Sequence, residues 1–117
     1  MARTIVAAAL AAALATPIPL AAAPSTVKGE VVDVQCALKD TKNTGSDHAD
    51  CALSCARRGA TMGIRTADGV YTITGDYTRE NNKRLLEFVA QQVEATGEVT
   101  EKDGKKLIDV SAIAASK

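Results

Sequence analysis

The chain has no tryptophan, and two tyrosines and one phenylalanine are its only aromatic residues. Proteins that bind single-stranded nucleic acid stack bases on aromatic side chains, and so few aromatics cannot build such a surface. The net charge is also unsuitable for binding nucleic acid, because 14 basic residues balance 14 acidic ones. Nucleic acids and anionic membranes attract an excess of basic residues. We therefore expect neither nucleic acid nor, once the N-terminal segment is removed, a membrane as a partner.

Histidine is almost absent as well, since His48 is the only one. It lies in a segment with cysteines, so the sequence offers no Ser–His–acid arrangement. No pair of carboxylates is placed for general acid and base catalysis. We therefore predict that the protein is not an enzyme and that it has no catalytic residues.

Long apolar runs are missing except at the N-terminus. Arg3 is followed by small and apolar residues from Ile5 to Ala15, and then by Pro17 and Pro19. This pattern is typical of a secretory signal peptide, and the run is shorter than the roughly 20 residues that span a bilayer. We predict a signal peptide over 1–23, cleavage near 21–25, and a periplasmic or secreted protein.

The rest of the chain, over 26–115, predicts one small domain. Valines over 27–36 indicate a first strand, and Asp-Gly turns indicate two hairpins. A cap and charges that suit the helix dipole predict a short helix, and apolar residues at helical spacing predict a second. Gly97 predicts a bulge or bend. The expected elements are strands over 27–36, 62–66, 70–74, 93–100 and 105–113, and helices over 47–58 and 81–92.

This order predicts a mainly β fold with two helices. Five short strands with a helix between the third and fourth are the order of an OB-fold barrel. The short helix over 47–58 is then an insertion between the first and second strands. An open α+β sheet with both helices on one face is the alternative.

The most informative feature is a cluster of cysteine and histidine: Cys36, His48, Cys51 and Cys55. On a helix, the last three fall within an arc of about 60° beside an apolar stripe. Cys36, at the end of the first strand, can be brought to the same place by the intervening loop. Thiolates and imidazole are ligands for soft or borderline metal ions.

We therefore predict a copper or zinc site with Cys36, Cys51 and Cys55 as ligands. His48 is a fourth ligand or a gate, since it lies about 10.5 Å along a regular helix from Cys55. Met62 could add a thioether, although a methionine in such a place more often belongs to the core. The predicted function is to bind, buffer or transfer the metal ion, and another exported protein is a second candidate partner.

Two other interpretations of the cysteines remain open. Exported cysteines usually form disulfides, and Cys36 with Cys51 or Cys55, or Cys51 with Cys55, would stabilise a small non-catalytic interaction module. An odd number of cysteines leaves one thiol over. The third interpretation is a thiol-redox factor in which Cys51, nearest the helix N-terminus, is the attacking thiol.

The spacing of these residues resembles that of a group of small exported bacterial proteins. The motifs are Asp33-x-x-Cys36, Gly45-x-x-His48-x-x-Cys51-Ala52-x-x-Cys55, the Asp68-Gly69 hairpin and Val93-x-x-x-Gly97. The resemblance covers essentially the whole of the chain after the signal peptide. It implies an OB-like fold and a shared cluster used for metal or redox work, in a family of unassigned activity. It implies no substrate.

Overall fold

The computed structural model describes residues 24–39 and 45–116. It is mainly β, as predicted, and contains a five-stranded sheet with short helices. The strands are β1 (Ser25–Asp33), β2 (Met62–Thr66), β3 (Gly69–Thr74), β4 (Gln92–Lys102) and β5 (Lys105–Ala115). The helices are α1 (Val34–Lys39), α2 (Ala49–Arg57) and α3 (Arg79–Asn82), with 3₁₀ turns η1 (Ser46–His48), η2 (Asp76–Thr78) and η3 (Lys83–Phe88). The predicted signal peptide over 1–23 lies outside the described residues.

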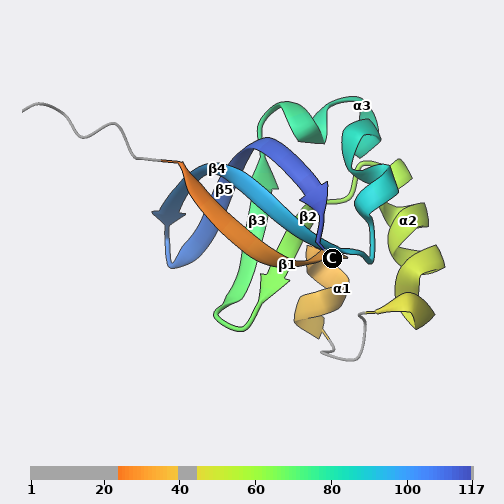
Figure 1. Cartoon of the computed structure of the whole chain (residues 1–117). Coiled ribbons are helices and arrows are strands. Elements are labelled where there is room, and N and C mark those ends of the chain that lie inside the picture. Colours follow the sequence, from red (N-terminus) through yellow and green to blue (C-terminus); the bar gives the residue numbers. More distant parts are fainter. Residues whose placement is uncertain (1–23, 40–44, 117) are drawn as a thin grey trace, which may run out of the picture.

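The sheet closes on itself. Its strand order is β1-β2-β3-β5-β4, and β4 returns to pair with β1 (Figure 1). β3 and β5 run parallel, whereas the other pairs are antiparallel. The expectation of an open sheet is therefore wrong. Alternate residues of the strands face inward and form the core with two alanines of α2 and residues of η2 and η3: Val27, Val31, Ala52, Ala56, Met62, Ile64, Ile73, Tyr77, Leu85, Val89, Val93, Ala95, Ile108 and Val110.

Both predicted hairpins are confirmed. β2 and β3 are joined by a tight turn that ends at Gly69, and β4 and β5 by Asp103 and Gly104, both at positive φ. The predicted bulge is also confirmed, because the β4–β5 register shifts between Thr96 and Gly97. Gly97 suits this place because a Cβ there would meet the backbone oxygen of Asp109 at 2.1 Å.

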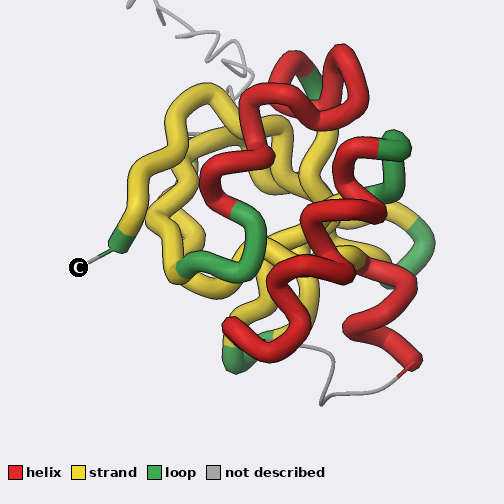
Figure 2. Tube along the Cα trace, turned by 90° about the vertical axis from the view of Figure 1, so that its right-hand side faces the viewer, coloured by secondary structure: helices red, strands yellow, loops and turns green. Residues whose placement is uncertain are grey.

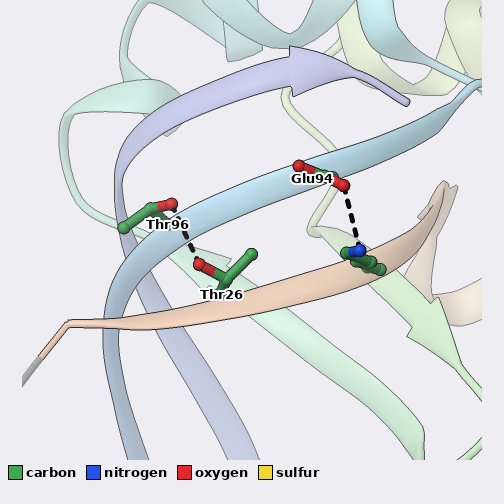
Figure 3. A network of polar contacts seen from close by, with 4 residues as sticks. Thr26, Glu94 and Thr96 are labelled. Atoms are coloured by element: carbon green, nitrogen blue, oxygen red, sulfur yellow. Dashed lines mark hydrogen bonds and ion pairs between the residues drawn. The ribbon is translucent and has the colours of Figure 1, made fainter. Parts of the chain in front are cut away.

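β1 and β4 are joined on their outer face by two cross-strand contacts (Figure 3). The Lys28 ammonium lies 3.1 Å from a Glu94 carboxylate oxygen, and the Thr26 and Thr96 hydroxyls lie 3.4 Å apart. Both charged side chains are substantially exposed, at 70% and 47%. Exposed ion pairs of this kind contribute at most about 1 kcal/mol. The closure of the sheet therefore depends on the core and the backbone hydrogen bonds rather than on this surface pair.

The first strand ends earlier than predicted. β1 stops at Asp33, so Cys36 does not close the strand but lies in the short helix α1. The reason is the Asp33 side chain, whose Oδ1 accepts hydrogen bonds from the backbone N–H groups of Gln35 (3.0 Å) and Cys36 (3.5 Å). A carboxylate in this position satisfies the first free N–H groups of a helix and favours its start.

The predicted helical insertion is confirmed between β1 and β2, and it consists of α1, η1 and α2. These segments and α3 gather at one end of the sheet (Figure 1), and they lie in front when that end faces the viewer (Figure 2). Ala52 and Ala56 are the buried face of α2. Within residues 24–39 and 45–116, none of the helices is both long and apolar enough to span a membrane.

The predicted helix over 81–92 is wrong. Glu80, Asn81 and Asn82 adopt left-handed backbone angles, with φ of 53°, 53° and 59°. The chain then continues as the 3₁₀ turn η3, which ends at Phe88, and Gln92 already belongs to β4. The apolar residues that suggested an α-helix instead lie on a 3₁₀ turn, in which side chains three residues apart share a face.

A buried side chain explains this unusual backbone. Asn82 is 3% exposed, and its Nδ2 donates hydrogen bonds to the carbonyls of Ala56 (3.0 Å) and Ala60 (2.9 Å). These carbonyls lie at and just beyond the C-terminus of α2, where helices leave carbonyl groups without partners. The left-handed turn therefore serves to direct one amide onto the end of α2, the helix that carries Cys51 and Cys55.

Candidate functional site

The cysteines are presented by two of the inserted helices. Cys36 is half-buried in α1, Cys55 is half-buried in α2, and Cys51, one turn earlier in α2, is exposed. Residues four apart on a helix lie on the same face, about 6 Å apart along the axis. Among the described residues, no disulfide joins any of the three cysteines.

A carboxylate that the sequence analysis did not assign to the site joins the thiols. Asp33 is 4% exposed, and its Oδ2 accepts a hydrogen bond from Sγ of Cys36 at 3.6 Å. The same carboxylate also raises the pKa of the Cys55 thiol. The last residue of β1 therefore accepts a hydrogen bond from a thiol of α1 and acts electrostatically on a thiol of α2.

The charges of this group act on one another. The pKa of the Cys36 thiol is raised by its burial and then by the Asp33 carboxylate. The pKa of Cys55 is raised first by its hydrogen bond to Asp33 and then by burial. The charge of Cys51 contributes to both increases. Three thiols and one carboxylate thus form a single electrostatic group, which we name the thiol cluster (Asp33, Cys36, Cys51 and Cys55).

The thiol cluster is organised by a thiol hydrogen bond and does not form a preformed metal site. Within the described part of the chain, no group of three or more His, Cys, Asp or Glu side chains has the geometry of a metal site. The Cys36 thiol instead points its hydrogen at Asp33. A metal ion would have to displace these protons, and the side chains would have to turn toward it. Thiol side chains on short helices can make such rotations without a change of fold.

His48 has a different environment. It ends the turn η1 at the N-terminus of α2, so the helix is irregular there, and its Nε2 is buried without a hydrogen-bond partner among the described residues. Leaving a buried polar atom unpaired costs about 1–3 kcal/mol. The structure therefore joins Asp33, rather than His48, to the thiols by hydrogen bonds. Met62, whose thioether was considered as a ligand, is fully buried in the core.

The sequence contained a signal for Asp33. Along β1 the buried residues Val27, Gly29 and Val31 alternate with more exposed ones, and Asp33 is the next member of the inward-facing series. An acidic residue at an inward position needs a partner, because burying an isolated carboxylate is costly. Asp33 lies three residues before Cys36, so the Cys36 thiol could have been identified as that partner.

Comparison with known proteins adds no assignment, since no family model and no curated protein matches the chain. The function must therefore be argued from the residues of the thiol cluster.

The raised pKa values lead to a prediction for thiol reactivity. Alkylation requires the thiolate, so at about pH 8 we expect Cys36 and Cys55 to react more slowly than exposed Cys51. Asp33→Asn removes the negative charge and lowers both pKa values, so Cys36 and Cys55 should react several-fold faster. Peptide mapping by mass spectrometry after timed iodoacetamide treatment measures each site. Unchanged rates at Cys36 and Cys55 in the variant would contradict the role of Asp33.

Proposed function

We propose that this protein binds a copper or zinc ion through Cys36, Cys51 and Cys55 and that it buffers this metal or passes it on. The observation that supports the proposal is the hydrogen bond from the Cys36 thiol of α1 to the buried Asp33 carboxylate, which also acts electrostatically on the Cys55 thiol of α2. Thiolates suit Cu(I) and Zn(II), and a carboxylate attracts a cation. His48, with its unpaired buried nitrogen, is a further candidate donor or a gate.

The electrostatics of Cys36 and Cys55 suit metal binding better than redox attack, so the alternative thiol-redox interpretation depends on Cys51 as the attacking thiol. A redox-active cysteine needs a lowered pKa so that the thiolate can attack, whereas the pKa values of Cys36 and Cys55 are raised. A metal ion supplies the positive charge that deprotonation of these thiols requires. Binding should therefore release protons and strengthen as the pH rises.

The fold supports a binding role rather than an enzymatic one in this proposal. We propose that the closed sheet is an OB-fold barrel, because the strand order β1-β2-β3-β5-β4 includes a parallel β3–β5 pair and a helical segment lies between β3 and β4. The barrel is then a rigid support for the inserted helices. The predicted signal peptide makes the periplasm or the extracellular space the place of action.

Native mass spectrometry on protein purified without oxygen tests the proposal. We expect one copper or zinc ion per chain, and we expect Cys36→Ser and Cys55→Ser to weaken binding at least about 100-fold, beyond the 10–100-fold typical of an outer-shell partner. Ser54→Ala, also on α2 but exposed, is the control and should bind as the unaltered chain does.

Thiol counting separates the rivals in the same samples. Three reactive thiols after removal of the metal agree with ligands, whereas one reactive thiol indicates a disulfide and the interaction module. If the unaltered chain binds neither copper nor zinc, the proposed function is wrong.

A further inference from the structure

Asp33 occupies a position that an apolar residue would normally fill. It ends the inward-facing series of β1, lies opposite Met62 of β2 in the register, and is 4% exposed. A carboxylate so placed loses most of its hydration and must recover the lost energy from hydrogen bonds or from a cation. The groups around the Asp33 carboxylate therefore indicate which kind of ligand it is suited to bind.

The two oxygens of Asp33 have different partners. Oδ1 accepts hydrogen bonds from the backbone N–H groups of Gln35 and Cys36, at 3.0 and 3.5 Å, and this fixes the orientation of the carboxylate. Oδ2 accepts the thiol hydrogen of Cys36 at 3.6 Å. Metal-binding carboxylates are commonly oriented in this way, with one group of hydrogen bonds holding the ligand and one oxygen left for the ion. Oδ2 is the oxygen directed at the Cys36 thiol.

We propose that Oδ2 of Asp33, rather than His48, supplies the fourth donor of the site and that this carboxylate selects a divalent ion of the zinc class over Cu(I). The inference rests on the proposed function, because it concerns the metal that Cys36, Cys51 and Cys55 bind. It identifies a ligand and a specificity that the cysteine pattern alone does not give.

Charge is the first reason for this selectivity. Three thiolates and one carboxylate carry four negative charges, so Zn(II) leaves a net charge of about −2 and Cu(I) leaves about −3. Each uncompensated charge in a part-buried site is unfavourable. Ligand chemistry is the second reason, since carboxylate oxygen binds Zn(II) at about 2.0–2.2 Å. Cu(I), by contrast, prefers sulfur ligands alone.

Position is the reason to choose Asp33 over His48. Asp33 already accepts a hydrogen bond from the Cys36 thiol, and its carboxylate also raises the pKa of the Cys55 thiol. His48 begins the helix on which Cys55 lies seven residues later, and its Nε2 is buried without a hydrogen bond. When the ion binds, three S–H bonds break, three metal–sulfur bonds form, and the protons pass to solvent with no change of oxidation state.

The test compares Asp33→Asn with the unaltered full-length chain. Asn keeps the size of the side chain and an oxygen that can cap α1, but it removes the charge. Affinities for Zn(II) and for Cu(I) are measured without oxygen by competition with chromophoric chelators. We expect the variant to lose at least about ten-fold in Zn(II) affinity and less than three-fold in Cu(I) affinity. Asp50→Asn, an exposed carboxylate on α2, is the charge-matched control and should change neither.

The outcomes separate this inference from the proposed function. If the unaltered chain binds metal but Asp33→Asn keeps its Zn(II) affinity, or loses Zn(II) and Cu(I) equally, the selectivity by Asp33 is overturned while the metal site stands. Zinc X-ray absorption on the unaltered chain is a second measurement that does not depend on folding of the variant. Sulfur at about 2.3 Å with one carboxylate oxygen is expected, and the scattering of an imidazole ring would assign the fourth position to His48 instead.

Discussion

Asn82→Asp is expected to lower the free energy of unfolding by about 2–4 kcal/mol. The Asn82 amide donates to the carbonyls of Ala56 and Ala60 from a position that is 3% exposed. A carboxylate of the same shape cannot donate to either. The Ala56 carbonyl keeps the backbone N–H of Gly59 at 3.0 Å, whereas the Ala60 carbonyl loses the Asn82 amide, and a buried carbonyl left without a partner costs about 1–3 kcal/mol. The buried charge adds a further penalty. Urea unfolding followed by far-UV circular dichroism measures the difference.

Two related variants separate the hydrogen bonds from the backbone strain. Asn82→Gly loses the amide but relieves the left-handed φ of 59°, so it should be less destabilising than Asn82→Ala. Asn81→Asp is the control, because Asn81 has nearly the same backbone angles and is exposed. Its effect should stay within about 0.5 kcal/mol. Similar losses in Asn81→Asp and Asn82→Asp would show that the amide of Asn82 is not what fixes the end of α2.

Gly97→Ala is expected to destabilise the sheet by about 3 kcal/mol. A Cβ at this position would lie 2.1 Å from the Asp109 oxygen and 2.9 Å from the Val110 Cα. These are backbone atoms, so β4 and β5 would have to separate at the bulge, and overpacking of this kind costs about 1–3 kcal/mol or more. The measurement is again urea unfolding.

Gly104→Ala is the matched control for that change. Gly104 has φ of +75°, but a Cβ there would have open space around it. Only the left-handed backbone should then matter, at about 1–2 kcal/mol. If Gly97→Ala costs no more than Gly104→Ala, the close approach of β4 and β5 at the bulge is not a constraint on the fold.

Local signals in the sequence were sufficient for much of the fold. Asp-Gly pairs identified both hairpins, Gly97 identified the bulge, and the dipole-matched charges identified α2. Each of these features depends on a few neighbouring residues. The pattern could not give the left-handed turn at Glu80–Asn82, because Asn82 adopts it to reach carbonyls more than twenty residues away in the sequence. A contact between distant segments overrode the local helical pattern there.

The candidate site was predictable in part for the same reason. Helical spacing placed Cys51 and Cys55 on one face of α2, and α1 brings Cys36 to them. Asp33 appeared in the sequence analysis only as part of the Asp33-x-x-Cys36 motif, because its burial depends on the closed sheet and on the packing of α2 against β1. The role of a side chain that both caps a helix and faces a cluster cannot be derived from spacing alone.

The direction of β1 has a practical consequence for affinity tags and fusions. β1 is nine residues long, so Ser25 and Asp33 lie about 27 Å apart at 3.3–3.4 Å per residue. The opposite end of the chain is nearer the thiols, since Ser116 donates to the carbonyl of Gln92, which pairs with Glu30 in the second half of β1. A polyhistidine tag at that end would therefore place additional metal ligands nearer the thiol cluster. Measurements that test the proposed metal site should use a tag ahead of Ser25 instead.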